Sequence, residues 1–455
     1  MKKALHIIAL FSLVSWSAFG QNFIRIGQSD AEHQIRIPQD QALELRLPIT
    51  PSTGFGWYSA NNTEGVVKQI GDWEFISDNP ANPIGSSGTQ VIHYVATAAG
   101  TADLELVYKR PWEDVSNATA HYKVTIVSEG VYSGVEVKPY VPTTDPVMDA
   151  AALVSNDEKT LGLPASFSWL DQGQMTVCKN QGSCGSCWAF AACGSFESVV
   201  KIWDNVTRDM AEQWLVNCTP GMDCGGGMFP GSMFKNYGCV YEPDQPYKAT
   251  DGTCKSSYTY HEKPKGYQEV SASTAQIKQA IYNYGPIWAA ICAGSNFQNY
   301  KSGVLTKSDG SQMNHAIVLC GWDDATSSWV LRNSWGTTWG ENQGYMRIKW
   351  GVSIVGTHPT YFDYRGIIPH VPTNVNDIDV SSASVYPNPS SGLFTFSGLT
   401  NENTIEVYDY IGNLVYQNTS KNSSVAVDLM DKSHGIYMYK IINANGVKSG
   451  KLMVY

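Results

Sequence analysis

The stretch Gln181-Gly182-Ser183-Cys184-Gly185-Ser186-Cys187-Trp188-Ala189-Phe190 decides how the central part of this chain folds and reacts. It sets Cys187 at the start of an apolar run, directly behind a glycine-rich turn. A thiol attacks carbonyl groups only as its thiolate, and a helix N-terminus with a neighbouring imidazolium lowers a cysteine pKa from about 8.5 to roughly 3.5–7.5. The pattern therefore predicts that Cys187 is a nucleophile.

A nucleophilic thiol needs a nearby histidine, and His315 is the best candidate among those that follow Cys187. It opens the apolar run 316–322, which is typical of a buried strand that would hold the ring rigidly at the edge of a cleft. Further on, Asn333 supplies an amide that orients the imidazole tautomer, and the indole of Trp335 keeps water off that hydrogen bond. Cys187, His315 and Asn333 are the expected triad.

These residues resemble the active-site signature of papain and the cathepsins, over the stretch 182–190. His315 and Asn333 follow Cys187 at separations close to the roughly 130 to 150 residues found in that family. The resemblance extends from Leu163 to about Tyr364. It implies that Cys187 is the nucleophile, that His315 is first the base and then the acid, and that Asn333 orients His315. It also implies that the Gln181 side chain forms the oxyanion hole together with the Cys187 backbone N–H.

The same resemblance implies the substrate contacts. Gly226 and Gly227 align with a glycine pair on the cleft wall, where backbone is free to pair with an extended substrate. The family's usual asparagine before this pair is Gly225 here. The other expected substrate-binding residues are Met228, Ala290, Met313, Asn314, Ala316 and Trp335.

Of these, Met228, Ala290, Met313 and Ala316 align with the pocket for the second substrate residue before the cut. They are apolar and mostly small, so they predict a pocket for an aliphatic or aromatic side chain; a plain core role is the alternative. Only a short connection separates Tyr247 from Cys254. It leaves no room for the histidine-bearing loop of the family's carboxydipeptidases, so an endopeptidase is expected.

All ten cysteines lie between Cys178 and Cys320, and this usage favours an oxidising compartment. By position in the family, Cys184 pairs with Cys224, Cys218 pairs with Cys254, and Cys187 stays free. The pairing of the remaining five stays open, with a Cys178–Cys239 bridge as one alternative: Cys178, Cys193, Cys239, Cys292 and Cys320. No cofactor and no metal are expected, because no second cysteine and histidine cluster has ligand spacing.

Length, charge and the N-terminus bound the remaining classes of function. The 455 residues suffice for about three domains. The net charge of −10 without a basic stripe makes nucleic acid an unexpected partner. Residues 1–20 have the charged start, apolar run and small-residue end of a secretory signal peptide. No later run of 18 apolar residues occurs, so no transmembrane segment is expected.

Residues 21–130 alternate between apolar and polar, as in Leu43, Leu45 and Leu47, and predict a half-buried antiparallel sheet in a small sandwich. Three of the turns resemble the binding loops of chagasin, a protein inhibitor of papain-like proteases. Their residues are Pro51, Ser52, Thr53, Gly54 and Phe55, then Gly85 and Gly88, then Arg110, Pro111 and Trp112. The resemblance implies an intramolecular inhibitor that keeps the protease latent until the linker 131–162 is cut; a folding or surface-binding role is the alternative.

Residues 367–383 form a second linker by composition, and 384–455 contain short strands at turn-marked spacing. Motifs such as Val385-Tyr386-Pro387-Asn388-Pro389 and the terminal 451–455 resemble the sorting domain of type IX secretion cargo in Bacteroidetes-type Gram-negative bacteria. The resemblance implies the type IX machinery as a partner and export across the outer membrane, with release or attachment at the cell surface. A carbohydrate-binding or adhesion module is the alternative.

The expected fold is therefore multidomain. A two-lobed α+β papain-like domain at 163–366 is flanked by two all-β immunoglobulin-like sandwiches at 21–130 and 384–455. The expected function is a secreted cysteine endopeptidase acting on peptide or protein substrates. The alternative is an inhibitor or surface-binding protein that uses a non-catalytic papain-like scaffold.

Overall fold

The computed structural model describes residues 23–78, 83–130, 163–368, 383–399, 402–409, 412–443 and 446–455. The expected signal peptide 1–20, the linker 131–162 and most of the linker 367–383 lie outside the described residues. The chain divides into two compact units, Met1–Ile368 and Pro369–Tyr455. The expected domains 21–130 and 163–366 thus fall in one unit, because loops of the first dock on the second.

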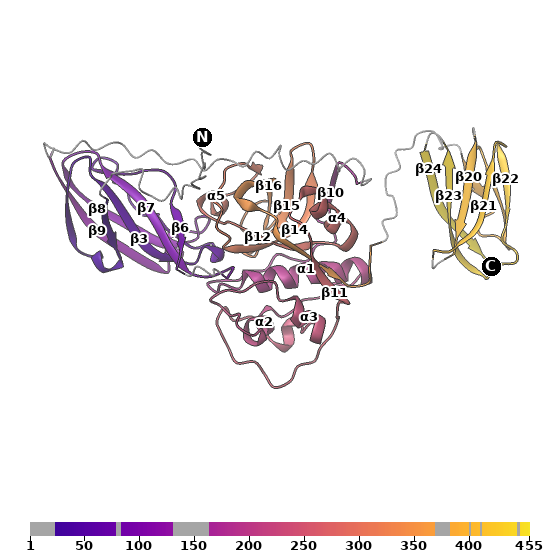
Figure 1. The fold of residues 1–455 in the computed structure, drawn as a ribbon, viewed down its shortest axis with the longest axis horizontal. Helices are drawn as coiled ribbons and strands as arrows, with labels where there is room; N and C mark the ends of the chain where they lie inside the picture. The colour runs from indigo at the N-terminus through magenta and orange to yellow at the C-terminus, as the bar shows by residue number, and fades with distance from the viewer. Residues whose placement is uncertain are drawn as a thin grey trace, which may run out of the picture. The chain divides into compact units, whose positions relative to one another are not determined.

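Residues 23–130 form two sheets over one apolar core. The first sheet has the order β1 (Ile24–Gly27), β3 (Ala42–Ile49), β7 (Gly88–Ala96) and β5 (Val67–Gln69), with β6 (Glu74–Ser77) also paired to β7. The second has the order β2 (Gln34–Pro38), β9 (Ala120–Glu129), β8 (Gly100–Lys109) and β4 (Gly56–Ser59). Figure 1 shows these strands in indigo and violet.

The core of this all-β part follows the predicted alternation. Leu43, Leu45 and Leu47 on β3 are all buried between the two sheets. Glu44 departs from the pattern, because it is also buried although the alternation predicts an outward, solvated position. Its carboxylate accepts hydrogen bonds from Arg25 at 2.9 Å and Arg46 at 2.6 Å, and these cations offset its loss of solvation. The immunoglobulin-like character of the sandwich stays a prediction.

The α+β part contains an eight-stranded sheet and five α-helices. The sheet has the order β11 (Gly266–Glu269), β17 (Thr357–Asp363), β12 (Ile287–Ile291), β14 (His315–Asp323), β15 (Ser328–Arg332), β16 (Tyr345–Lys349) and β13 (Val304–Leu305), with β10 (Ser166–Ser168) paired to β14. The helices are α1 (Cys187–Asp204), α2 (Glu212–Cys218), α3 (Gly231–Tyr237), α4 (Thr274–Tyr284) and α5 (Ser295–Gln298).

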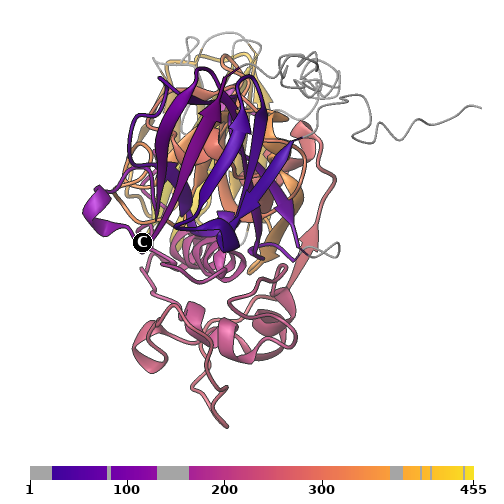
Figure 2. The same ribbon diagram turned by 90° about the vertical axis from the view of Figure 1, so that its left-hand side faces the viewer.

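Helix α1 is the central element of this part. Every side chain from Cys187 to Val200 is buried, as expected for a helix that is covered on all sides. The sheet lies on one side of α1 and the short helices α2 and α3 lie on the other, as Figures 1 and 2 both show. The helix ends at Asp204, where Asn205 adopts a left-handed conformation with φ of 54°. This arrangement places the N-terminus of α1 where the two lobes meet.

The second unit is an all-β body with two sheets. One has the order β18 (Ser384–Tyr386), β19 (Leu393–Ser397) and β22 (Ser424–Asp428). The other has the order β21 (Leu414–Ser420), β20 (Asn403–Tyr408), β23 (Gly435–Asn443) and β24 (Gly446–Val454). Side chains from both sheets, such as Phe394, Phe396, Ile405 and Leu452, form one apolar core.

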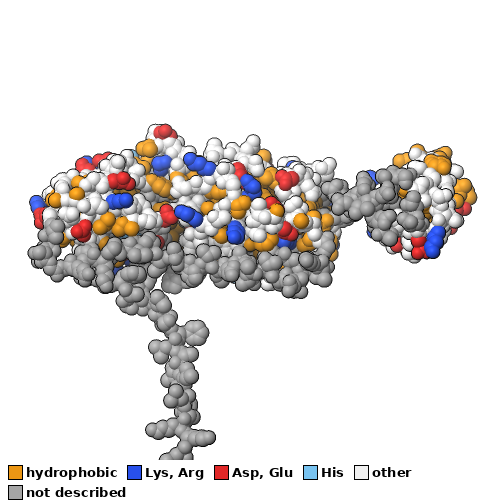
Figure 3. Space-filling model, turned by 90° about the horizontal axis from the view of Figure 1, so that it is seen from above, with side chains coloured by type: hydrophobic (Ala, Val, Ile, Leu, Met, Phe, Trp, Pro, Cys, Tyr) orange, Lys and Arg blue, Asp and Glu red, His pale blue; other side chains and the backbone are white. Residues whose placement is uncertain are grey.

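The distribution of charge on the described surface is relevant to the expectation that nucleic acid is not a partner. On the face shown in Figure 3, basic and acidic side chains are interspersed, without a long stripe of one sign among the described residues. Within the described ranges, no helix is both long enough and apolar enough to cross a membrane.

Candidate active site

Cys187 is the first residue of α1 and is fully buried. Ser186 occupies the N-cap position, yet its side chain does not cap the helix. The backbone N–H groups of Cys187 and Trp188 act instead on the Cys187 thiol, and each lowers its pKa. Unpaired amides at a helix N-terminus stabilise negative charge, so the backbone here favours the thiolate.

His315 and Asn333 come from two neighbouring strands of the sheet. His315 is the first residue of β14, and Asn333 directly follows β15, which pairs with β14 in antiparallel register. His315 Nε2 lies 2.8 Å from Asn333 Oδ1, and the indole of Trp335 packs beside the imidazole with ring centroids 5.1 Å apart. A carboxamide oxygen accepts only, so Nε2 carries a proton. Nδ1 has no hydrogen-bond partner among the described residues and is the acceptor nitrogen of the neutral ring.

Gln181 lies at the start of the turn that leads into α1 and is fully buried. Its backbone N–H donates to the Ser334 carbonyl at 2.9 Å, and the Ser334 hydroxyl donates to the side-chain Oε1 at 2.6 Å. One amide hydrogen on Nε2 donates to the Cys184 carbonyl at 2.8 Å. Because the amide nitrogen carries two hydrogens, the second remains for another acceptor.

Burial drives the thiol and the imidazole toward their neutral forms. It raises the pKa of Cys187 to about 12 and lowers the pKa of His315 to about 4. The Ser52 hydroxyl, which belongs to the N-terminal all-β part, lies against the thiol and lowers its pKa, but less than burial raises it. The docked all-β part therefore contacts the thiol, and the burial of the site as a whole disfavours a thiolate–imidazolium pair.

The glycine pair of the α+β part binds a loop of the N-terminal part. Gly227 N–H donates to the Ile84 carbonyl at 2.9 Å, and Gly85 N–H donates to the Asn314 carbonyl at 3.0 Å. Ile84 is fully buried among core side chains of the α+β part. A Cβ at Gly226 would lie 3.0 Å from the Ile84 carbonyl, so glycine permits this close approach. The loop 83–86 thus pairs by backbone with the predicted substrate-binding glycines.

The predicted pocket residues divide into two groups. Met228 lines a cavity of about 220 Å³ together with side chains that include Phe229 and Trp288. Ala290 and Ala316 are cross-strand partners on β12 and β14, are buried, and do not line this cavity. Met313 is partly buried and is also absent from its lining.

The other two predicted inhibitory loops contact Trp335 and the turn before α1. The Trp335 indole N–H donates to the Ser52 carbonyl at 2.7 Å, and Trp112 stacks on Trp335 with centroids 5.2 Å apart. Arg110 donates to Thr53 O at 2.9 Å, to Asn180 Oδ1 at 3.0 Å and to Gly182 O at 3.1 Å. The bond to Thr53 joins two loops of the N-terminal part to each other. The bonds to Asn180 and Gly182 join the N-terminal part to the segment before α1.

The remaining loop residues contribute unevenly. A Cβ at Gly54 would lie 2.5 Å from the Trp112 ring and 3.0 Å from the Trp335 ring, so the close packing there needs glycine. The Pro51 carbonyl accepts a long 3.4 Å bond from Gln298 Nε2, and the Phe55 ring packs against Arg110. Gly88 does not take part in the same way: it begins β7 and packs against β6 of its own sheet. Pro111 makes no hydrogen bond across the interface among the residues that the structure describes.

Sequence reasoning does not identify several contact residues, among them Asn180, Gln298, Ile84 and Tyr58. Ile84 precedes the predicted glycine-rich loop, and its signal was a lone apolar residue beside polar turn residues. Tyr58 donates a hydrogen bond to Gln298 across the interface at 2.5 Å, and nothing in the local pattern around β4 indicates it. Such contacts depend on docking of one part of the chain onto another.

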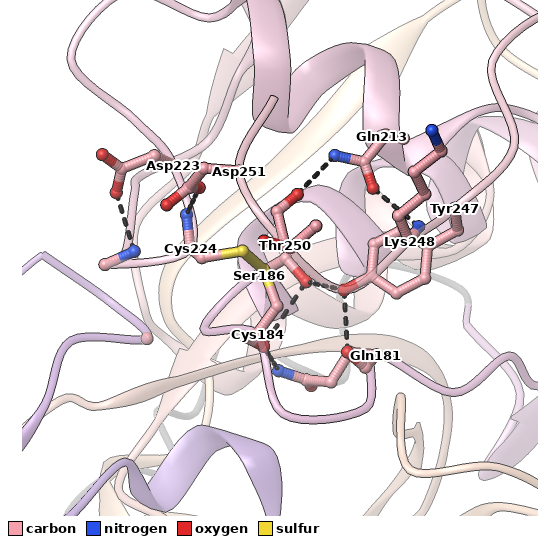
Figure 4. Close-up of a disulfide and its surroundings, with 12 residues drawn as sticks. Gln181, Cys184, Ser186, Gln213, Asp223, Cys224, Tyr247, Lys248, Thr250 and Asp251 are labelled. Atoms are coloured by element: carbon pink, nitrogen blue, oxygen red, sulfur yellow. Dashed lines mark hydrogen bonds between the residues drawn. A yellow bond between two sulfur atoms is a disulfide. The ribbon is translucent and has the colours of Figure 1, made fainter. Parts of the chain in front are cut away.

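Figure 4 shows the surroundings of the Cys184–Cys224 disulfide, which lies beside the turn before α1. A second disulfide joins Cys218 to Cys254. These are the two pairs that the resemblance implies. The five cysteines of open pairing are buried and belong to no disulfide among the described residues, so the alternative Cys178–Cys239 bridge is absent there.

Comparison with protein-family models separates the chain into three parts. Residues 163–361 match the papain family cysteine protease model, and residues 36–126 match the chagasin family peptidase inhibitor model. Residues 384–455 match the secretion system C-terminal sorting domain. The three resemblances predicted from the sequence are confirmed.

Curated relatives agree with the first of these matches. The senescence-specific cysteine protease SAG39 of Oryza sativa subsp. indica is 40% identical over 202 residues, which cover 42% of this chain and only 59% of that protein. Macrodontain-1 of Ananas macrodontes is 37% identical over 199 residues, 43% of this chain and 92% of that protein. Cysteine proteinase COT44 of Brassica napus is 32% identical over 280 residues, 55% of this chain and 84% of that protein. The chain belongs to the papain family of cysteine proteases.

Proposed function

We propose that this protein is a cysteine endopeptidase that hydrolyses peptide bonds with Cys187, His315, Asn333 and Gln181. The observation that carries the proposal is the His315–Asn333 hydrogen bond of 2.8 Å, together with a cysteine at a helix N-terminus whose thiol interacts with the backbone of Ala316, the residue after His315. Asn333 holds the proton on Nε2 and leaves Nδ1 to exchange a proton with the thiol and the leaving group.

In the proposed reaction the Cys187 thiol gives its proton to His315, and the thiolate adds to the substrate carbonyl carbon. The carbonyl oxygen becomes an oxyanion that accepts from the Gln181 amide and the Cys187 backbone N–H. The C–N bond then breaks, and the imidazolium protonates the departing amine. Water, deprotonated by the same imidazole, attacks the thioester and releases the acid and the thiol.

Substrates would bind in an extended conformation along the cleft. The Gly227 N–H and the Asn314 carbonyl are backbone groups that already pair with the loop 83–86, and an extended peptide offers them the same partners. The burial of Ile84 against these groups supports a preference for an aliphatic residue two positions before the cut. The short connection 247–254 supports an endopeptidase, since it leaves no room for a loop that would close the cleft.

The N-terminal part would hold the enzyme latent. Its loops contact the cleft at two places: the loop 83–86 pairs with Gly227, and Trp112 stacks on Trp335. A substrate needs the same backbone groups, so binding of substrate and docking of the loops exclude one another. Cutting the linker 131–162 would convert an intramolecular inhibitor into a separate, dilutable one.

The sorting domain supports secretion or attachment to the cell surface. We extend this to export by a type IX machinery to the outer face of a Gram-negative bacterium, with residues 1–20 as the signal peptide for the first membrane.

The test is hydrolysis of a fluorogenic peptide with isoleucine two positions before the cut. It uses the full-length Gly85→Ala chain, here called the open-cleft variant, because a Cβ at Gly85 would lie 2.2 Å from the Gly185 carbonyl oxygen and expel the loop. We expect hydrolysis that disappears when Cys187→Ala is added. If iodoacetamide labels Cys187 in the open-cleft variant but no peptide is cut, the cleft is open and the chain is not a peptidase.

A further inference from the structure

The Tyr247 hydroxyl makes two short hydrogen bonds at the turn before α1, drawn in Figure 4. It donates to the Gln181 carbonyl at 2.7 Å and lies 2.6 Å from Ser186 Oγ. A phenol has one hydrogen and the carbonyl only accepts, so Ser186 donates to the Tyr247 oxygen. The other acceptor within reach of Ser186, the Cys184 carbonyl, is farther away at 3.5 Å.

These two bonds hold both ends of one short turn. Gln181 begins the turn, Ser186 ends it, and Cys187 follows directly. The turn includes Gly182, with φ of 62°, and it is also tied by the Gln181–Ser334 hydrogen bonds and by the Cys184–Cys224 disulfide. The Ser186 hydroxyl, which at an N-cap ordinarily accepts from the helix, bonds to Tyr247 instead. Tyr247 is the anchor that joins the two ends of the turn, Gln181 and Ser186, through one hydroxyl group.

Tyr247 is itself fixed by the surrounding lobe. Its backbone N–H donates to Glu242 Oε1 at 2.7 Å, and the next N–H, of Lys248, donates to Gln213 Oε1 at 2.8 Å. The ring packs edge-on against Phe190 of α1 with centroids 4.8 Å apart. Burial raises the pKa of the Tyr247 phenol above its ordinary value, so the hydroxyl stays a donor over the working pH range.

We propose that Tyr247 is a positioning residue for the oxyanion hole. Its hydroxyl sets the distance between the Gln181 backbone and Ser186. Through this distance it sets the relative position of the Gln181 side-chain amide and the Cys187 backbone N–H. These are the two donors that the proposed function assigns to the oxyanion, so the inference rests on that function. Preorganised donors stabilise a tetrahedral oxyanion only if both point at one position.

The experiment compares three substitutions, each made in the full-length open-cleft variant. Tyr247→Phe removes only the hydroxyl. Tyr258→Phe is the matched control, because its hydroxyl is also hydrogen-bonded in this lobe, to Lys255 N at 3.1 Å, without contact to the turn 181–186. Gln181→Ala removes one proposed oxyanion donor, and the Gln181→Ala/Tyr247→Phe double variant completes the cycle. We measure kcat and KM on the peptide, and the rate at which iodoacetamide alkylates Cys187.

We expect Tyr247→Phe to lower kcat about 10-fold, less than the roughly 10²- to 10³-fold loss for removing a donor outright. KM and the alkylation rate should stay within about twofold, because alkylation forms no oxyanion. In the Gln181→Ala background, Tyr247→Phe should lower kcat by less than about threefold, because the side chain that Tyr247 positions is gone.

Three results would overturn the inference. One is a kcat for Tyr247→Phe equal to that of Tyr258→Phe. The second is an alkylation rate that falls as far as kcat, which would mean a damaged nucleophile. The third is full additivity with Gln181→Ala. Absence of any Cys187-dependent hydrolysis in the open-cleft variant itself is distinguishable from these and overturns the proposed function together with the inference.

Discussion

Replacing Gly85 by alanine should release the N-terminal part from the cleft. Gly85 has φ of 98°, a conformation that favours glycine, and its added Cβ would lie 2.2 Å from the Gly185 carbonyl oxygen. Gly185 cannot move far, because it follows Cys184 of the Cys184–Cys224 disulfide and its N–H donates to the Cys224 carbonyl at 2.9 Å. The loop, not the cleft wall, must therefore give way.

The contacts that would be lost set the size of the effect. The loop forms two backbone hydrogen bonds, Gly227 N–H to Ile84 O and Gly85 N–H to Asn314 O, worth about 0.5–1.5 kcal/mol each. Burial of Ile84 contributes about 1.5–3 kcal/mol more. A total of roughly 2.5–6 kcal/mol shifts the equilibrium between docked and open forms about 10²- to 10⁴-fold toward the open form.

The assay is the initial rate of peptide hydrolysis by intact full-length chains. The rate is proportional to the open fraction, so it should rise by the same factor until it saturates at full activity. Gly65→Ala is the matched control, because a Cβ there meets nothing within 4 Å. Gels taken before and after the assay establish that the linker is uncut. Each tenfold change in rate corresponds to about 1.4 kcal/mol. The prediction is refuted if uncut Gly85→Ala hydrolyses the peptide at a rate within about threefold of that of Gly65→Ala.

Three further predictions concern the same site. Alkylation of Cys187 by iodoacetamide in the uncut wild-type chain should be slow at pH 7 and rise with pH toward about 12, because burial raises the thiol pKa to that value and only the thiolate reacts; a rate that is flat from pH 7 to 10 would contradict this. Asn333→Ala in the open-cleft variant should lower kcat by about 10- to 100-fold with KM little changed, since nothing then fixes the His315 tautomer; an unchanged kcat would remove Asn333 from the proposed mechanism. Trp112→Ala in the full-length chain should raise the hydrolysis rate about tenfold, because stacking on Trp335 is lost, and a rate equal to wild type would show that this loop adds nothing to latency.

Local patterns were sufficient to name the residues of the candidate site. Cys187 follows a glycine turn and opens an apolar run, and His315 opens a strand. Asn333 follows the next strand, so the antiparallel β14–β15 pairing brings it to 2.8 Å from His315. Such short-range patterns predict the folded structure well because each depends on the conformation of a few neighbouring residues. The alternation in β3 predicted the core side of the first sheet for the same reason.

Other features depend on contacts between distant segments. Gly88 was grouped with the inhibitory loops, yet it packs within its own sheet, and the unremarked Ile84 is the side chain buried in the cleft. Glu44 is buried because Arg25 and Arg46 reach it from two strands. The residues next to Ile84 or Glu44 in the sequence do not indicate these distant partners.

The sequence by itself determined the three family resemblances and pointed to Cys187, His315 and Asn333 as the proposed triad, since these rest on residue types at characteristic spacing. The papain resemblance then implied the two disulfide pairs. Only the tertiary structure decided that the Ser52 loop lies against the thiol, and that burial of the site raises the pKa of the thiol and lowers the pKa of the imidazole. It also decided that Tyr247 joins the two ends of the turn 181–186. The reason is physical: desolvation and hydrogen-bond geometry depend on which distant segments meet, and they exist only once the chain has folded.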